Sequence, residues 1–67
     1  MKVIRQLNST AINSATYDED THILTIEFKR GASYDYPAVP RIEFEKLIAA
    51  PSAGQYFNAH IKQYAAH

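Results

Sequence analysis

The chain has 67 residues, with seven Lys or Arg and seven Asp or Glu, so its formal net charge is zero. A hydrophobic fraction of 46% and a charged fraction of 21% exclude a typical disordered tail, and the length leaves room for only one core. The absence of cysteine excludes disulfides, thiolate metal sites and a cysteine nucleophile. The sequence has neither a membrane-length apolar run nor the apolar stretch of a signal peptide, so we expect a cytoplasmic protein, used whole.

The first half of the chain predicts a small antiparallel sheet. We expect residues 1–10 to form an N-terminal arm or edge segment and residues 11–67 to form a single domain. Beyond the arm, the polarity patterns and intervening turns predict three strands, at residues 11–17, 22–28 and 32–36. Because the connections between them are short, the strands should form a three-stranded antiparallel meander.

The second half predicts two helices. The first opens at Pro40 and carries an apolar stripe formed by Phe44, Leu47 and Ile48. The second begins at Ser52, where Ser-Ala-Gly-Gln fits a capping box. The predicted fold class is therefore α+β, with the meander followed by two α-helices packed on one face.

An ordered set of short motifs resembles the KTSC domain, a family named for a C-terminal extension of some lysyl-tRNA synthetases and also found as small stand-alone proteins of bacteria and phages. The motifs span about residues 8–64: Ser9, Ile12 and Tyr17-Asp18; Tyr34-Asp35-Tyr36; Val39-Pro40; Phe44, Leu47 and Ala49-Ala50; and Ser52, Gly54, Tyr56-Phe57-Asn58 and Ile61-Lys62. The synthetase context of this family implies RNA binding. Similar sequences often carry basic residues where this chain has Ala53, Ala59 and His60, which implies weaker phosphate contact here.

Two tyrosines, Tyr34 and Tyr36, lie on one face of the last predicted strand. As a binding site they would form a platform on which unpaired bases stack. The patterning favours burial instead, because Ser33 and Asp35 occupy the opposite, polar face. That polar face would also carry Glu27, and its carboxylates would repel a phosphate backbone.

Positive charge is expected at the hairpin tip, Lys29-Arg30, and on the second helix at Lys62. Together with Arg41 and Lys46 these residues would form a modest phosphate-contacting rim. The alternative is a solvated surface in which Arg41 pairs with Glu45 at i, i+4.

The second helix contributes further candidates. Tyr56, His60, Gln63 and His67 follow helical spacing along one flank, which is either a binding face or a half-exposed flank beside the core. His60 and His67 lie too far apart along a helix for a zinc site, and the acidic turn at residues 18–20 lacks EF-hand spacing, so we predict no metal. The sequence also lacks a hydrolase elbow, a phosphate loop and a zinc-protease motif, so we predict no enzyme activity and no cofactor.

These observations leave two functions open. The first is a binding module for RNA or another nucleic acid. The second is a protein–protein interaction module, such as a bacterial or phage accessory factor, or a weak homodimer, with no membrane contact in either case. The candidate binding residues are Lys29, Arg30, Tyr34, Tyr36, Tyr56, Asn58, His60 and Lys62.

Overall fold

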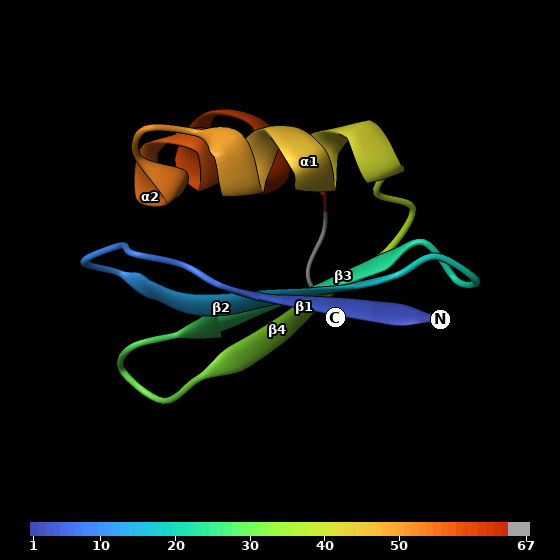
Figure 1. The fold of residues 1–67 in the computed structure, drawn as a ribbon, viewed down its shortest axis with the longest axis horizontal. Coiled ribbons are helices and arrows are strands. Elements are labelled where there is room, and N and C mark those ends of the chain that lie inside the picture. The colour runs from blue at the N-terminus through green and yellow to red at the C-terminus, as the bar shows by residue number, and fades with distance from the viewer. Residues whose placement is uncertain (65–67) are drawn as a thin grey trace.

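The computed structural model describes residues 1–64 and has two layers, a sheet and a helical layer. The elements in chain order are β1 (Lys2–Gln6), β2 (Ile12–Asp18), β3 (Ile23–Phe28), β4 (Ser33–Tyr36), α1 (Arg41–Ala49), α2 (Ala53–Tyr56) and the π-helical η1 (Phe57–Ile61). The strands form one antiparallel sheet in the order β1-β2-β3-β4. All helices lie on the same face of this sheet (Figure 1), which confirms the predicted α+β meander.

The structure has a fourth strand that the sequence pattern did not distinguish from an arm. β1 pairs with β2 in a register that sets Lys2 opposite Asp18 and Gln6 opposite Ser14. Only Val3 of β1 is partly buried, and the other residues of the strand are exposed. β1 is therefore held mainly by its backbone ladder with β2, and it forms one edge of the sheet.

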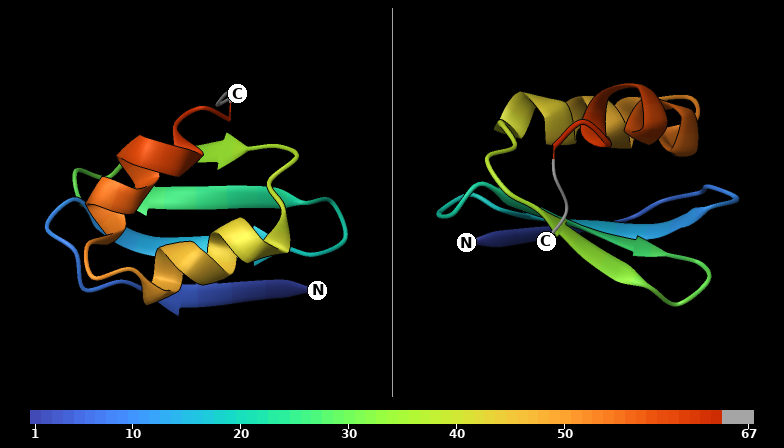
Figure 2. Two further views of the ribbon diagram at one scale, coloured as in Figure 1. Left: turned by 90° about the horizontal axis from the view of Figure 1, so that it is seen from above. Right: turned by 180° about the vertical axis from the view of Figure 1, so that it is seen from behind.

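The core lies between the two layers. Seen from above, α1 crosses the β1–β2 side of the sheet, and the α2–η1 segment crosses the β3–β4 side (Figure 2). On the first side Tyr17 stacks on Phe44, with ring centroids 5.3 Å apart. The sheet and the helices together bury the side chains of Ile12, Ala15, Tyr17, Leu24, Ile26, Tyr36, Val39, Phe44, Leu47, Ala53, Phe57 and Ile61. Each large aliphatic or aromatic side chain in this set contributes about 1.5–3 kcal/mol.

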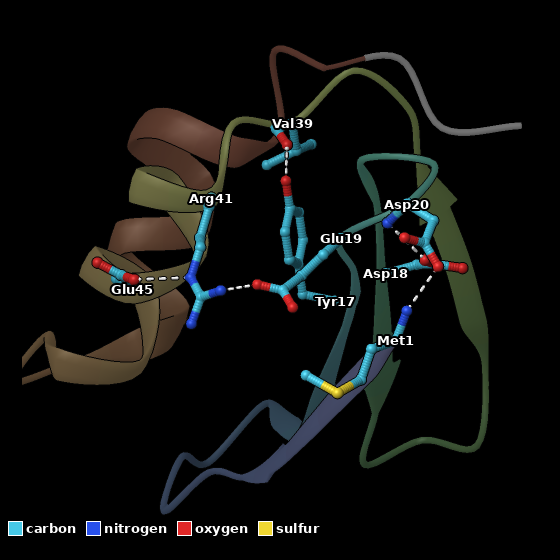
Figure 3. A network of polar contacts seen from close by, with 8 residues as sticks. All are labelled: Met1, Tyr17, Asp18, Glu19, Asp20, Val39, Arg41 and Glu45. Carbon is cyan, nitrogen blue, oxygen red and sulfur yellow. Dashed lines mark hydrogen bonds and ion pairs between the residues drawn. The ribbon is translucent and has the colours of Figure 1, made fainter.

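The segment that enters α1 is fastened to the sheet by the backbone of Val39. The amide of Val39 donates a hydrogen bond to the carbonyl of His22 (2.9 Å). The carbonyl of Val39 accepts one from the hydroxyl of Tyr17 (2.7 Å), as Figure 3 shows. His22 was expected to begin a strand. Its φ of 59° instead places it in the turn before β3, and Ala38 has the same left-handed φ.

The second helical segment starts at Ser52, as predicted. The hydroxyl of Ser52 accepts a hydrogen bond from the amide of Gln55 (3.3 Å), which is half of a capping box. In η1 the helix widens, since the amide of Lys62 donates to the carbonyl of Phe57, five residues earlier (2.8 Å). No helix among residues 1–64 is both long enough and apolar enough to cross a membrane.

Candidate nucleic-acid interface

A groove of about 530 Å³, which we call the hairpin groove, opens where the β3–β4 hairpin faces η1. Its volume lies within the range typical of ligand sites, about 300–1,000 Å³. Six of the eight candidate residues line it, together with four others. The lining residues are Thr10, Ala11, Phe28, Lys29, Arg30, Tyr34, Tyr36, Phe57, Asn58 and Lys62.

The aromatic part of the groove is built by edge-to-face contacts. The ring of Phe28 meets that of Tyr34 at 5.8 Å and that of Phe57 at 5.4 Å, and Tyr36 meets Phe57 at 5.5 Å between centroids. Tyr36 is 5% exposed, as the patterning predicted, and burial raises its pKa. Tyr34 is 38% exposed, so the expected burial of both tyrosines is wrong for this residue. Tyr34 lies nearer the hairpin turn than Tyr36 does, paired with Ile26 of β3.

Three cations line the groove from two sides. Lys29 and Arg30 project from the hairpin turn, which Gly31 closes with a φ of 98°. The guanidinium of Arg30 lies 5.5 Å from the ring centroid of Phe28, in a cation–π contact that restrains it beside the groove. Lys62 follows η1 and lines the groove from the helical side. None of the described lining residues is acidic, so the charged side chains of this lining are all cationic and suit an anionic ligand.

Tyr56 and His60 lie outside this groove. The hydroxyl of Tyr56 donates a hydrogen bond to the carboxylate of Glu43, and its ring stacks on that of His60 at 4.4 Å. Burial, followed by the bond to Glu43, raises the pKa of Tyr56 to about 12. The Tyr56–His60 pair therefore joins α2 and η1 to α1 and is separate from the residues of the groove. His67, which the spacing placed on the same flank, lies outside the described residues.

Arg41, which was considered for a phosphate-contacting rim, is engaged elsewhere. Its guanidinium pairs with Glu45, at 2.9 Å from Nε, as the i, i+4 spacing predicted, and also with Glu19 of the β2–β3 turn (Figure 3). These two carboxylates neutralise its charge. Lys46, the other α1 candidate for this rim, is exposed and does not line the hairpin groove, so neither α1 cation adds to the three that do.

The acidic turn between β2 and β3 uses its carboxylates for structure. Oδ1 of Asp18 accepts a hydrogen bond from the amide of Asp20 (2.9 Å), and this bond is the main cause that lowers the pKa of Asp18. The carboxylate of Asp20 pairs with the terminal amine of Met1 (2.6 Å). These contacts fasten the turn to the start of β1 (Figure 3).

The face of the sheet opposite the helices carries carboxylates. Thr25 donates to Asp35 (2.7 Å), and Ser14 donates to Glu27 (3.1 Å). These groups give the open face a negative character that disfavours phosphate contacts, as the sequence pattern indicated.

Four lining residues were missed from the sequence: Thr10, Ala11, Phe28 and Phe57. Phe28 and Phe57 are apolar, so their residue type indicates a core position, and the structure places Phe57 in the core and Phe28 packed against it. Thr10 and Ala11 precede β2 and reach the groove because the amide of Lys29 donates to the carbonyl of Ala11 (2.9 Å). That contact joins residues 18 positions apart, and no local pattern reports it.

Comparison with known proteins gives one consistent result. The profile of the KTSC domain family matches residues 8–64, a range that includes the whole hairpin groove and leaves out β1. A crystal structure of a KTSC domain protein from Yersinia pestis superposes with a TM-score of 0.93 at 28% identity, covering 100% of this chain and 96% of that one.

Two relatives differ greatly in length. A lysine–tRNA ligase from Nostoc punctiforme is 45% identical over 53 residues, which are 79% of this chain and 9% of the ligase. An uncharacterized protein from Stutzerimonas stutzeri is 41% identical over 56 residues, which are 84% of this chain and 79% of that protein. The chain thus spans a small segment of the ligase and most of the shorter relative.

Proposed function

The chain belongs to the KTSC domain family, and we propose that it is a small non-enzymatic module that binds single-stranded RNA in the hairpin groove. The observation that carries this proposal is the combination of three cations with the partly exposed ring of Tyr34, in a groove whose described lining holds no acidic residue. Proteins that bind single strands combine a positive groove with aromatic rings on which bases stack. The similar segment in a protein named lysine–tRNA ligase agrees with an RNA ligand, and the same proposal places the protein in the cytoplasm.

A binding role fits the groove better than a catalytic one. Its described lining has neither a carboxylate nor an imidazole, which are among the commonest proton-transfer groups of enzymes. Its lysines and arginine attract phosphate, and its aromatic side chains pack against one another. This set of groups supports the binding of a ligand more than its chemical conversion.

A protein partner or a weak homodimer is the second candidate, and the exposed apolar side chains give it less support. Ile4 is exposed on the open face of the sheet, and Ile42 is exposed on α1, in the other layer. Exposed apolar residues that are scattered singly are ordinary, whereas a docking surface needs a contiguous patch. A homodimer would make thermal stability depend on protein concentration.

The proposal is tested by the fluorescence anisotropy of a labelled, mixed-sequence single-stranded RNA titrated with the protein. We expect saturable binding that weakens as salt rises from about 50 to 200 mM. The double variant Lys29→Glu/Arg30→Glu should lose at least about tenfold in affinity, because it replaces two groove cations by anions.

A matched control separates a local site from an effect of net charge. Lys2→Glu/Arg5→Glu makes the same charge change on β1, at the opposite edge of the sheet from β4. It should bind RNA several-fold more tightly than the hairpin variant. Equal losses in the two folded variants, or no binding by the unaltered protein at low salt, would refute an RNA site in the hairpin groove.

A further inference from the structure

We infer that the hairpin groove takes a single unpaired nucleotide, stacked on Tyr34, with the flanking phosphates held by Lys29 and Arg30 on one side and by Lys62 on the other. This inference rests on the proposed function and specifies its ligand. The ligand is a short unpaired segment, such as a loop, a bulge or a strand end. A duplex or a long extended strand is not the preferred ligand.

The number of available rings sets the number of bases. Of the four aromatic side chains in the groove, Tyr36 and Phe57 are buried, and their rings meet each other edge to face. Phe28 is covered by Arg30 at 5.5 Å and is flanked by the rings of Tyr34 and Phe57. Only Tyr34 keeps a substantial exposed surface, at 38%. One exposed ring supports one stacked base.

The placement of the cations sets how much backbone the groove holds. Lys29 and Arg30 come from the hairpin turn beside β4, whereas Lys62 follows η1 on the opposite wall. A base between these walls presents its own phosphate and the next one to cations of both groups. Each phosphate neutralised on a single strand contributes about −0.7 to the slope of log affinity against log salt, so two phosphates predict a slope of about −1.4.

Polar side chains in the groove lie where they can contact the base edge. Asn58 is an exposed residue of η1, and Thr10 precedes β2. An amide and a hydroxyl each donate and accept hydrogen bonds, so these groups suit several bases. We therefore expect the site to distinguish an unpaired base from a missing base more strongly than it distinguishes one base from another.

The test is a set of competition titrations with unlabelled RNAs that range from a mononucleotide to a nonamer. Affinity should rise up to the trinucleotide and then stay level, apart from the statistical gain of a longer lattice. The salt slope should be about −1.4. A trinucleotide with an abasic central position should bind about tenfold or more weakly. Tyr34→Leu should cause a similar loss and should remove the difference between the normal and abasic trinucleotides, whereas Tyr34→Phe should preserve both affinity and discrimination.

The outcomes separate this inference from the proposed function. Binding that continues to strengthen up to the nonamer, a salt slope steeper than about −4, or indifference to the abasic position would overturn the one-nucleotide site while leaving RNA binding intact. The absence of binding at every length in low salt would overturn both. A level affinity beyond the trinucleotide, with the abasic penalty lost in Tyr34→Leu, would establish the site.

Discussion

The hydroxyl of Tyr17 should stabilise the fold by holding the segment that enters α1. Tyr17 is 1% exposed and Val39 is 0% exposed, so water cannot replace the 2.7 Å hydrogen bond between them. Tyr17→Phe removes the donor, keeps the ring on Phe44, and leaves the buried carbonyl of Val39 unsatisfied. The loss is about 1.5 kcal/mol, within the range for orphaning a buried acceptor. For a domain of this size, that lowers the melting temperature by about 6–12 °C.

Urea and thermal unfolding followed by circular dichroism measure this effect. Tyr34→Phe is the matched control, because it removes the same group from a side chain that is 38% exposed, and we expect it to change stability by less than about 0.5 kcal/mol. The dependence of the unfolding free energy on urea should be the same in both variants. If the unfolding free energy of Tyr17→Phe lies within about 0.5 kcal/mol of that of the unaltered protein, the hydrogen bond to the carbonyl of Val39 does not stabilise the fold, and the reasoning is refuted.

Two further predictions concern the backbone and a shifted pKa. Ala38→Gly should raise the unfolding free energy by about 0.5–1 kcal/mol, because φ at Ala38 is 59°, a left-handed conformation that glycine adopts without strain. Ala59→Gly, inside the helical segment, should lower the unfolding free energy by a similar amount. Urea titrations that give both changes the same sign would contradict this reasoning. Tyrosine Cζ chemical shifts should report a pKa of about 12 for Tyr56 and a lower value in Glu43→Gln, and an unchanged value would exclude any influence of Glu43. Because the raised pKa favours the protonated phenol, its contribution to stability is complete below the unfolded pKa of about 10 and is lost as pH rises through about 12.

The pattern of apolar residues was sufficient to predict most of the fold. In β3 the buried residues Leu24 and Ile26 alternate with more exposed ones, which is the strongest signal that a half-buried strand gives. In α1 the buried residues Phe44 and Leu47 lie three positions apart, on one helical face. These signals are local and arise from burial itself. β1 buries almost nothing, and its existence depends on pairing with β2, which local sequence does not report.

The candidate site was predictable as a set of residue types but not as a place. Lys29, Arg30 and Lys62 were singled out for their charge, yet only the folded sheet brings the hairpin to η1. Helical spacing alone also placed Tyr56 and His60 on one flank, and in the structure their rings stack on each other, away from the groove. Which flank of a helix faces a neighbouring loop is decided by tertiary packing, and the helix's own sequence determines only which residues share a flank.

The widened turn at η1 decides how the segment beside the hairpin groove responds to a change in chain length. The five-residue step from Phe57 to Lys62 accommodates one more residue than an α-helical turn would. Deleting Ala59 would turn this step into an ordinary α-helical turn, in which the amide of Lys62 still meets the carbonyl of Phe57 and in which Phe57 and Ile61, three positions apart, still share a face. A deletion inside α1 has no such extra residue to remove, so it would rotate every side chain beyond it by about 100°. A single deletion in η1 should therefore be tolerated far better than a single deletion in α1.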